Sequence, residues 1–204
     1  MNAFGAEFGK YASSVRNTSS GVRGVQTTTH VLDRHLGGEY YVCQLLNSSF
    51  AHCCLAWQAA QEGHGKPFYC SVHIFYPASS SYYASGNHEY QYTYGGALAE
   101  NAWHTLRIEA RYAGSTHYWN LYCNGNLASY VWWPYPTYNM AVTQLECIYD
   151  SYFFQGRHRN IYLKCADDVW RLQNSSWGPR ILSIEAGPYH IIWNYLYYDW
   201  EARL

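Results

Sequence analysis

The chain has 204 residues and a net charge of −1, and 13% of its residues are charged whereas 19% are aromatic. This length allows one domain with a sizeable core, and the near-neutral charge excludes the basic surface typical of nucleic-acid-binding proteins. No apolar run approaches the roughly 18 residues of a membrane-spanning helix, so we expect no membrane span.

The first half of the sequence predicts an arm followed by short strands. Residues 1–20 are polar and rich in Gly and Ser, which predicts a flexible N-terminal arm before a single domain over residues 21–204. Alternating or β-branched segments bounded by Gly or Pro predict strands at residues 21–31, 39–46, 68–76 and 88–94, the last ended by Gly95-Gly96. Residues 48–61 leave helix and strand open, because alanine favours helix while a short apolar run has no decisive period.

The segment Trp103–Tyr130 predicts a β-meander. Leu106 and Ile108 alternate with Arg107 and Glu109, as a sheet with one buried and one solvated face requires. Asn124-Gly125 then predicts a two-residue hairpin turn of type I′, in which both central residues have positive φ.

The C-terminal part adds further strand patterns. Residues 142–149, 160–165, 181–185 and 189–197 each predict a strand. About ten short strands separated by turn residues are typical of an all-β fold, and we predict a sandwich or jelly roll of two antiparallel sheets.

Two blocks of the meander resemble a known fold. The segments Trp103–Ile108 and Trp119–Leu127 resemble the paired strands of concanavalin-like sandwiches, in which a Trp-His strand precedes a strand ending in Asn-Gly or Asp-Gly. The resemblance implies a fold, and a fold by itself implies no activity.

A second resemblance implies chemistry. The order of Leu55–Ala60, Phe75–Pro77 and Gln144–Asp150 resembles that of glutamic peptidases (the eqolisin family), their neprosin-like relatives and uncharacterised bacterial relatives. The resemblance implies Gln58 and Glu146 as a facing catalytic pair that hydrolyses polypeptides under acidic conditions. A Glu carboxylate can accept the proton of an attacking water, and a Gln amide can donate to the developing oxyanion.

The sequence departs from the glutamic-peptidase pattern at several positions. Ala59 and Ala60 stand where the family has Gly and Val after the Gln, and Cys147 stands where it has Trp after the Glu. A purely structural role for Gln58 and Glu146 therefore stays open, as do two other functions: a non-enzymatic carbohydrate-binding module, and a tyrosine-rich surface protein that self-assembles as a homo-oligomer.

Residues 131–138 predict an aromatic loop or edge, because Pro134 and Pro136 cannot donate to a central strand. Exposed rings in such a loop can stack on sugars or anchor a polypeptide. The candidate ligand-binding residues are Trp132, Trp133, Tyr135 and Tyr138, with Tyr76 from an earlier strand end.

Seven cysteines, few lysines and an all-β pattern favour an extracellular, secreted protein with some disulfides and at least one unpaired thiol. Residues 1–20 contain no apolar segment of a signal peptide, so we expect the signal to be absent from this chain. The ten histidines show no metal-binding spacing, and we expect neither a metal nor a cofactor.

Overall fold

The computed structural model describes residues 10–32, 39–46, 54–61, 66–75, 89–113, 116–132, 138–147, 156–173, 181–185, 190–194 and 199–203. Within these ranges the regular structure consists of fourteen strands, and every pairing between them is antiparallel. The described residues include no helix that could cross a membrane.

The first eight strands are β1 (Lys10–Val31), β2 (Glu39–Leu46), β3 (Cys54–Gln61), β4 (Phe68–Phe75), β5 (Glu89–Leu98), β6 (Ala102–Ala113), β7 (Thr116–Cys123) and β8 (Asn126–Trp132). The other six are β9 (Tyr138–Cys147), β10 (Gly156–Cys165), β11 (Trp170–Leu172), β12 (Ile181–Glu185), β13 (His190–Asn194) and β14 (Asp199–Arg203).

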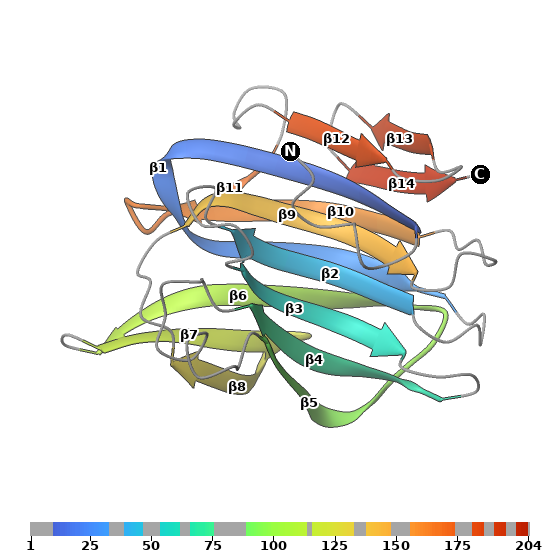
Figure 1. The fold of residues 1–204 in the computed structure, drawn as a ribbon, viewed down its shortest axis with the longest axis horizontal. Coiled ribbons are helices and arrows are strands. Elements are labelled where there is room, and N and C mark those ends of the chain that lie inside the picture. Colours follow the sequence, from blue (N-terminus) through green and yellow to red (C-terminus); the bar gives the residue numbers. More distant parts are fainter. Residues whose placement is uncertain are drawn as a thin grey trace.

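The long strand β1 belongs to both layers of the fold (Figure 1). Its first half, residues 10–17, pairs with β9 and β12, whereas residues 22–31 pair with β10 and β6, apart from one further pairing of Val22 with Tyr138 of β9. The change of partner coincides with Gly21, whose φ of 75° is in the region that glycine adopts without steric cost. We call β12, the first half of β1, β9, β2, β3, β4 and β5 the first layer. The second layer comprises β13, β14, β11, β10, the second half of β1, β6, β7 and β8.

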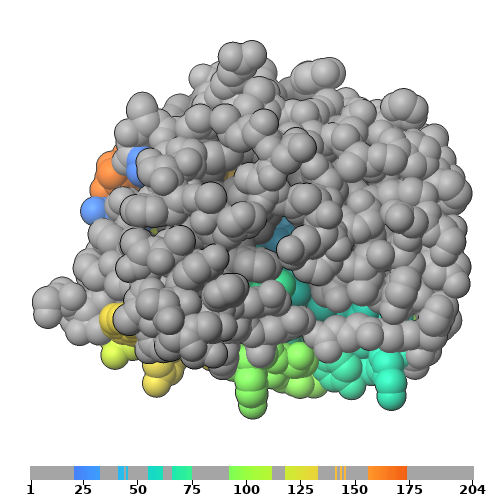
Figure 2. Space-filling view, in the orientation of Figure 1, coloured from blue at the N-terminus to red at the C-terminus, as the bar shows by residue number. Residues whose placement is uncertain are grey.

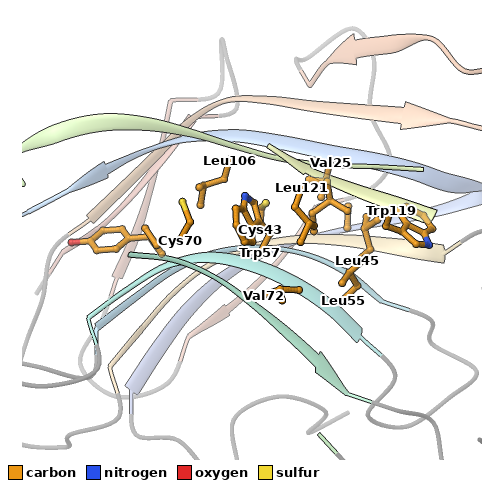
Figure 3. Close-up of a cluster of buried hydrophobic side chains, with 14 of the residues drawn as sticks. Val25, Cys43, Leu45, Leu55, Trp57, Cys70, Val72, Leu106, Trp119 and Leu121 are labelled. Carbon is orange, nitrogen blue, oxygen red and sulfur yellow. The ribbon is translucent and has the colours of Figure 1, made fainter. Parts of the chain in front are cut away.

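The core lies between the inward faces of the two layers (Figure 3). Leu106 and Leu121 project from the second layer, and Leu45, Leu55 and Trp57 from the first, all with no exposed surface. The predicted two-sheet antiparallel sandwich is confirmed, and β-branched and aromatic residues at alternate positions account for it.

Local predictions in the meander are confirmed. Leu106 and Ile108 are buried while Arg107 and Glu109 lie on the opposite face. Asn124 and Gly125 have φ values of 50° and 81°, as a type I′ turn requires.

The structure corrects or completes the sequence expectation at several strands. Residues 10–20 of the expected arm belong to β1, paired with β9, while residues 1–9 lie outside the described ranges. For residues 48–61 the sequence allows a helix or a strand, and the structure has a strand from position 54 onward. Gly95 and Gly96 do not end β5 but form an irregularity inside it, with a shift of register against β4. Of the predicted strand 189–197, positions 190–194 form β13 and the rest lie outside the described residues. The sequence did not predict β14 or the three-residue β11.

Candidate active site

Gln58 lies on the face of β3 that is turned away from the core. Its neighbours Trp57 and Ala59 belong to the core cluster, so alternation places Gln58 on the other face, together with Ala56 and Ala60. The side chain is nevertheless only 4% exposed. A buried amide standing between two methyl groups needs a hydrogen-bond partner.

Ser71 of β4 supplies that partner. The register sets Ser71 directly opposite Gln58, and the Gln58 Nε2 donates to Ser71 Oγ at 3.1 Å. Ser71 has no exposed surface, so the contact is shielded from water. Because a hydroxyl can donate or accept, Ser71 can hold the amide group in either orientation.

Glu146 occupies a register position on the same face as Gln58, with β2 between them. Val42 lies opposite both Gln58 and Gln144, and Tyr40 lies opposite both Ala60 and Glu146. Position 146 is therefore two strands across and two residues along from position 58. With usual sheet spacings this places the two Cα atoms about 10 Å apart across the sheet and about 7 Å along it.

This arrangement puts a carboxylate position and a fixed amide on one sheet face, with no other strand layer between them. Hydrolysis by a general base and an oxyanion donor requires both groups to face the same substrate.

Comparison with known proteins bears on the fold. No protein-family model matches the sequence, and no curated protein sequence matches it. The chain is similar to the crystal structure of scytalido-glutamic peptidase with a peptide-based transition-state analogue, with a TM-score of 0.55, 8% identity, and coverage of 95% of this chain and 97% of that one. This chain has a glutamic-peptidase-like fold.

A second solved structure is SCP-B, a member of the eqolisin family of peptidases, in complex with the tripeptide Ala-Ile-His. Its TM-score is 0.48 at 7% identity, with the same coverage of both chains. At such low identity the comparison with scytalido-glutamic peptidase establishes the glutamic-peptidase-like fold and leaves residue roles to the chemistry of this chain.

Only some of the aromatic residues predicted to bind a ligand lie in the described part of this glutamic-peptidase-like sandwich. Trp132 ends β8 on the outward face of the second layer and is 49% exposed. Tyr138 begins β9. Trp133, Tyr135 and Tyr76 lie outside the described residues. The structure thus places Trp132 on the outer face of the layer opposite the one that carries Gln58 and Glu146, and does not bring it together with them.

The four cysteines whose side chains are described are free thiols rather than disulfides: Cys43, Cys70, Cys123 and Cys165. A side-chain hydrogen bond with Cys123, together with burial, raises the pKa of Cys70, and the same bond lowers the pKa of Cys123. Burial raises the pKa of Cys43. Cys43 and Cys70 are therefore protonated core residues rather than nucleophiles.

The described residues contain no group of three or more His, Cys, Asp or Glu side chains placed to hold a metal ion.

Sequence reasoning missed Ser71 as the partner of Gln58. The alternation of β4 assigns Ser71 to the correct parity, but it cannot show which residue of β3 lies opposite. That register depends on the connection through residues 62–67, whose length is not a standard two-residue hairpin.

Proposed function

We propose that this chain hydrolyses peptide bonds in polypeptides under acidic conditions, with Glu146 as general base and Gln58 as oxyanion donor. The observation that carries the proposal is the register, which assigns both positions to one face of a glutamic-peptidase-like sandwich with Gln58 held by Ser71. Neither a metal nor a cofactor takes part in the proposed reaction.

In the proposed reaction the Glu146 carboxylate accepts a proton from water while the water oxygen bonds to the carbonyl carbon. The carbonyl oxygen becomes negative and accepts a hydrogen bond from the Gln58 amide, which favours the tetrahedral intermediate. Glu146, now protonated, returns the proton to the amide nitrogen as the C–N bond breaks. An ordinary glutamate has a pKa of about 4.3, so both protonation states are accessible at acidic pH.

The first experiment measures cleavage of an unfolded protein substrate at about pH 4, near the ordinary pKa of a glutamate. Glu146→Gln should lower kcat/KM by about 10²–10⁴-fold, the usual contribution of a general base. Glu39→Gln is the matched control, because position 39 of β2 has the opposite parity and belongs to the other face. Cleavage that survives in Glu146→Gln, or that is lost equally in Glu39→Gln, would refute the proposed base.

The second experiment tests which of two neighbouring glutamine side chains donates to the oxyanion. Gln58 and Gln144 both lie opposite Val42, but only Gln58 is assigned the oxyanion role. We expect Gln58→Ala to lower kcat by about 10²–10³-fold, as loss of one oxyanion donor does, and Gln144→Ala to have a smaller effect. The reverse order would transfer the donor role to Gln144.

A carbohydrate-binding role is a second candidate, because a different surface favours it. On the outward face of β7 and β8, Tyr130 is 59% and Trp132 is 49% exposed, and the rings of Tyr118 and Tyr130 meet edge to face with centroids 5.7 Å apart. The yellow residues of β8 project at one margin of the molecule (Figure 2). Saturable quenching of tryptophan fluorescence by an oligosaccharide, lost in Trp132→Ala, is the result expected for this role.

A further inference from the structure

Two arginines, a histidine and a tryptophan gather on the outward face of the second layer. His30 of β1 lies opposite both Trp103 of β6 and Arg157 of β10 in the register. Arg159 lies two residues further along β10, and alternation returns it to the same face. We call these four residues the arginine–tryptophan cluster.

The Trp103 ring organises the cluster. The Arg159 Cζ lies 3.6 Å from the centroid of that ring and the Arg157 Cζ lies 5.9 Å from it. The ring of His30 packs against the same tryptophan, with centroids 4.9 Å apart and an interplanar angle of 41°. A guanidinium stacked on an aromatic face keeps the N–H groups at its edge available to another partner.

Other cations of this layer are neutralised by carboxylates, whereas those of the cluster form no ion pair among the described residues. Arg23 pairs with Asp168 at 2.8 Å, Lys164 pairs with Glu109 at 3.0 Å, and both are therefore neutralised in place. Within the described part of the chain, neither Arg157 nor Arg159 forms an ion pair, and the buried Nε of Arg159 has no hydrogen-bond acceptor. A carboxylate residue, Glu201 of β14, occupies the register position opposite Arg157.

We propose that the arginine–tryptophan cluster is a binding site for a phosphate or sulfate group. Two guanidinium groups project from successive outward positions of one strand, and both lie against the Trp103 ring. A tetrahedral oxyanion offers enough acceptor oxygens for both, whereas a single carboxylate is filled by one bidentate arginine. The site lies on the outer face of the layer opposite the one that carries Gln58 and is independent of the proposed hydrolysis.

The test is a titration of the whole chain with inorganic phosphate at constant ionic strength, followed by NMR at the Trp103 indole N–H and the arginine Nε–H groups. We expect saturable shifts at these signals. Arg159→Gln should weaken the affinity at least tenfold and Arg157→Gln, at an exposed position that tolerates change, should weaken it several-fold. Arg111→Gln is the matched control, because it removes the same charge from an exposed position on the same face of β6.

Equal weakening by Arg111→Gln and Arg159→Gln would overturn the proposal, because the binding would then reflect only the general surface charge. Weaker binding in Glu201→Gln would also overturn it, since removing a negative charge next to Arg157 can only favour an anion at the cluster. Titrations with glucose 6-sulfate and O-phosphoserine identify the source of the group. Binding of either ester more tightly than inorganic phosphate supports a site for a larger ligand, and the opposite order supports a site for the free anion.

Discussion

At the residue scale, Gly24 of β1 is a position where no side chain fits beneath the ring of Trp170. A Cβ added there would lie 2.7 Å from the Trp170 ring and 2.9 Å from the backbone oxygen of Ile108. The backbone oxygen cannot move away as a flexible side chain could. The glycine thus allows Trp170 of β11 to pack directly on β1.

We expect Gly24→Ala to lower the free energy of unfolding by about 1–3 kcal/mol, the usual cost of overpacking. Gly96→Ala is the control, because a Cβ at Gly96 would meet nothing within 4 Å. It should change stability by less than about 0.5 kcal/mol. Urea unfolding of both variants checks this, and equal stability of the two would contradict the clash inferred at Gly24.

The candidate site shows where residue-level prediction from sequence ends. The resemblance to glutamic peptidases nominates Gln58 and Glu146, and their roles stay predictions. The relation of Gln58 to Ser71 and Val42 depends on strand register, which alternation specifies only to within two residues. Chemistry-bearing residues can therefore be nominated from sequence, whereas their partners require the paired strands.

At the element scale, the turn between β10 and β11 is held by Asp167. Its carboxylate accepts a hydrogen bond from Arg171 at 2.9 Å and one from the backbone N–H of Val169 at 3.3 Å. The hydrogen bond from Arg171 is the main reason that the pKa of Asp167 falls to about 2. The folded pKa is thus below the unfolded value of about 3.9.

The lowered pKa of Asp167 determines how the stability of the fold changes with pH. A carboxyl with a lowered folded pKa stabilises the fold fully above about pH 4 and loses that contribution as the pH falls toward 2. We expect the carboxyl carbon of Asp167 to titrate by NMR near pH 2 in the wild type. Arg171→Gln should move the midpoint up toward about 4, the ordinary value of an aspartate. A wild-type midpoint already near 4 would show that Arg171 does not hold the carboxylate in solution.

Strands that are marked by a pattern within a few consecutive residues can be predicted from the sequence, and strands that lack such a pattern cannot. The β6–β7–β8 meander follows from alternation and from Asn124-Gly125, both contained in a few consecutive residues. The strand β11 has only three residues, too few for any period to be visible. Gly95-Gly96 predicts a strand end but forms an irregularity inside β5, because glycine marks bulges and breaks equally well.

At the scale of the whole molecule, the feature hidden from sequence is the passage of β1 between layers. Its pairing partners are distant in sequence, from β6 and β9 to β12, and local propensity carries no information on them. The polar composition of residues 10–20 predicted an arm, yet pairing with β9 makes them part of a sheet. Tertiary pairing overrides local preference here, as it often does in β proteins.

Among the described residues, the two layers are joined through the core by polar contacts as well as by apolar packing, and Trp57 makes one of these contacts. Trp57 of β3 has no exposed surface, and its Nε1 donates to the backbone oxygen of Tyr122 on β7 at 2.9 Å. A shift in the pairing of β7 with β8 begins at Tyr122, so this oxygen lies where the ladder is irregular. The indole N–H therefore supplies a donor to a carbonyl in the interior.

Trp57→Phe should consequently cost about 2–4 kcal/mol in unfolding free energy, because it leaves a buried carbonyl unpaired and a void beside it. Trp132→Phe is the matched control, since the same substitution at a ring that is 49% exposed removes no contact between the layers. It should change stability by less than about 0.5 kcal/mol. Thermal and urea unfolding of both variants would decide the matter. A cost for Trp57→Phe no greater than that for Trp132→Phe would show that the hydrogen bond to the Tyr122 carbonyl does not stabilise the fold.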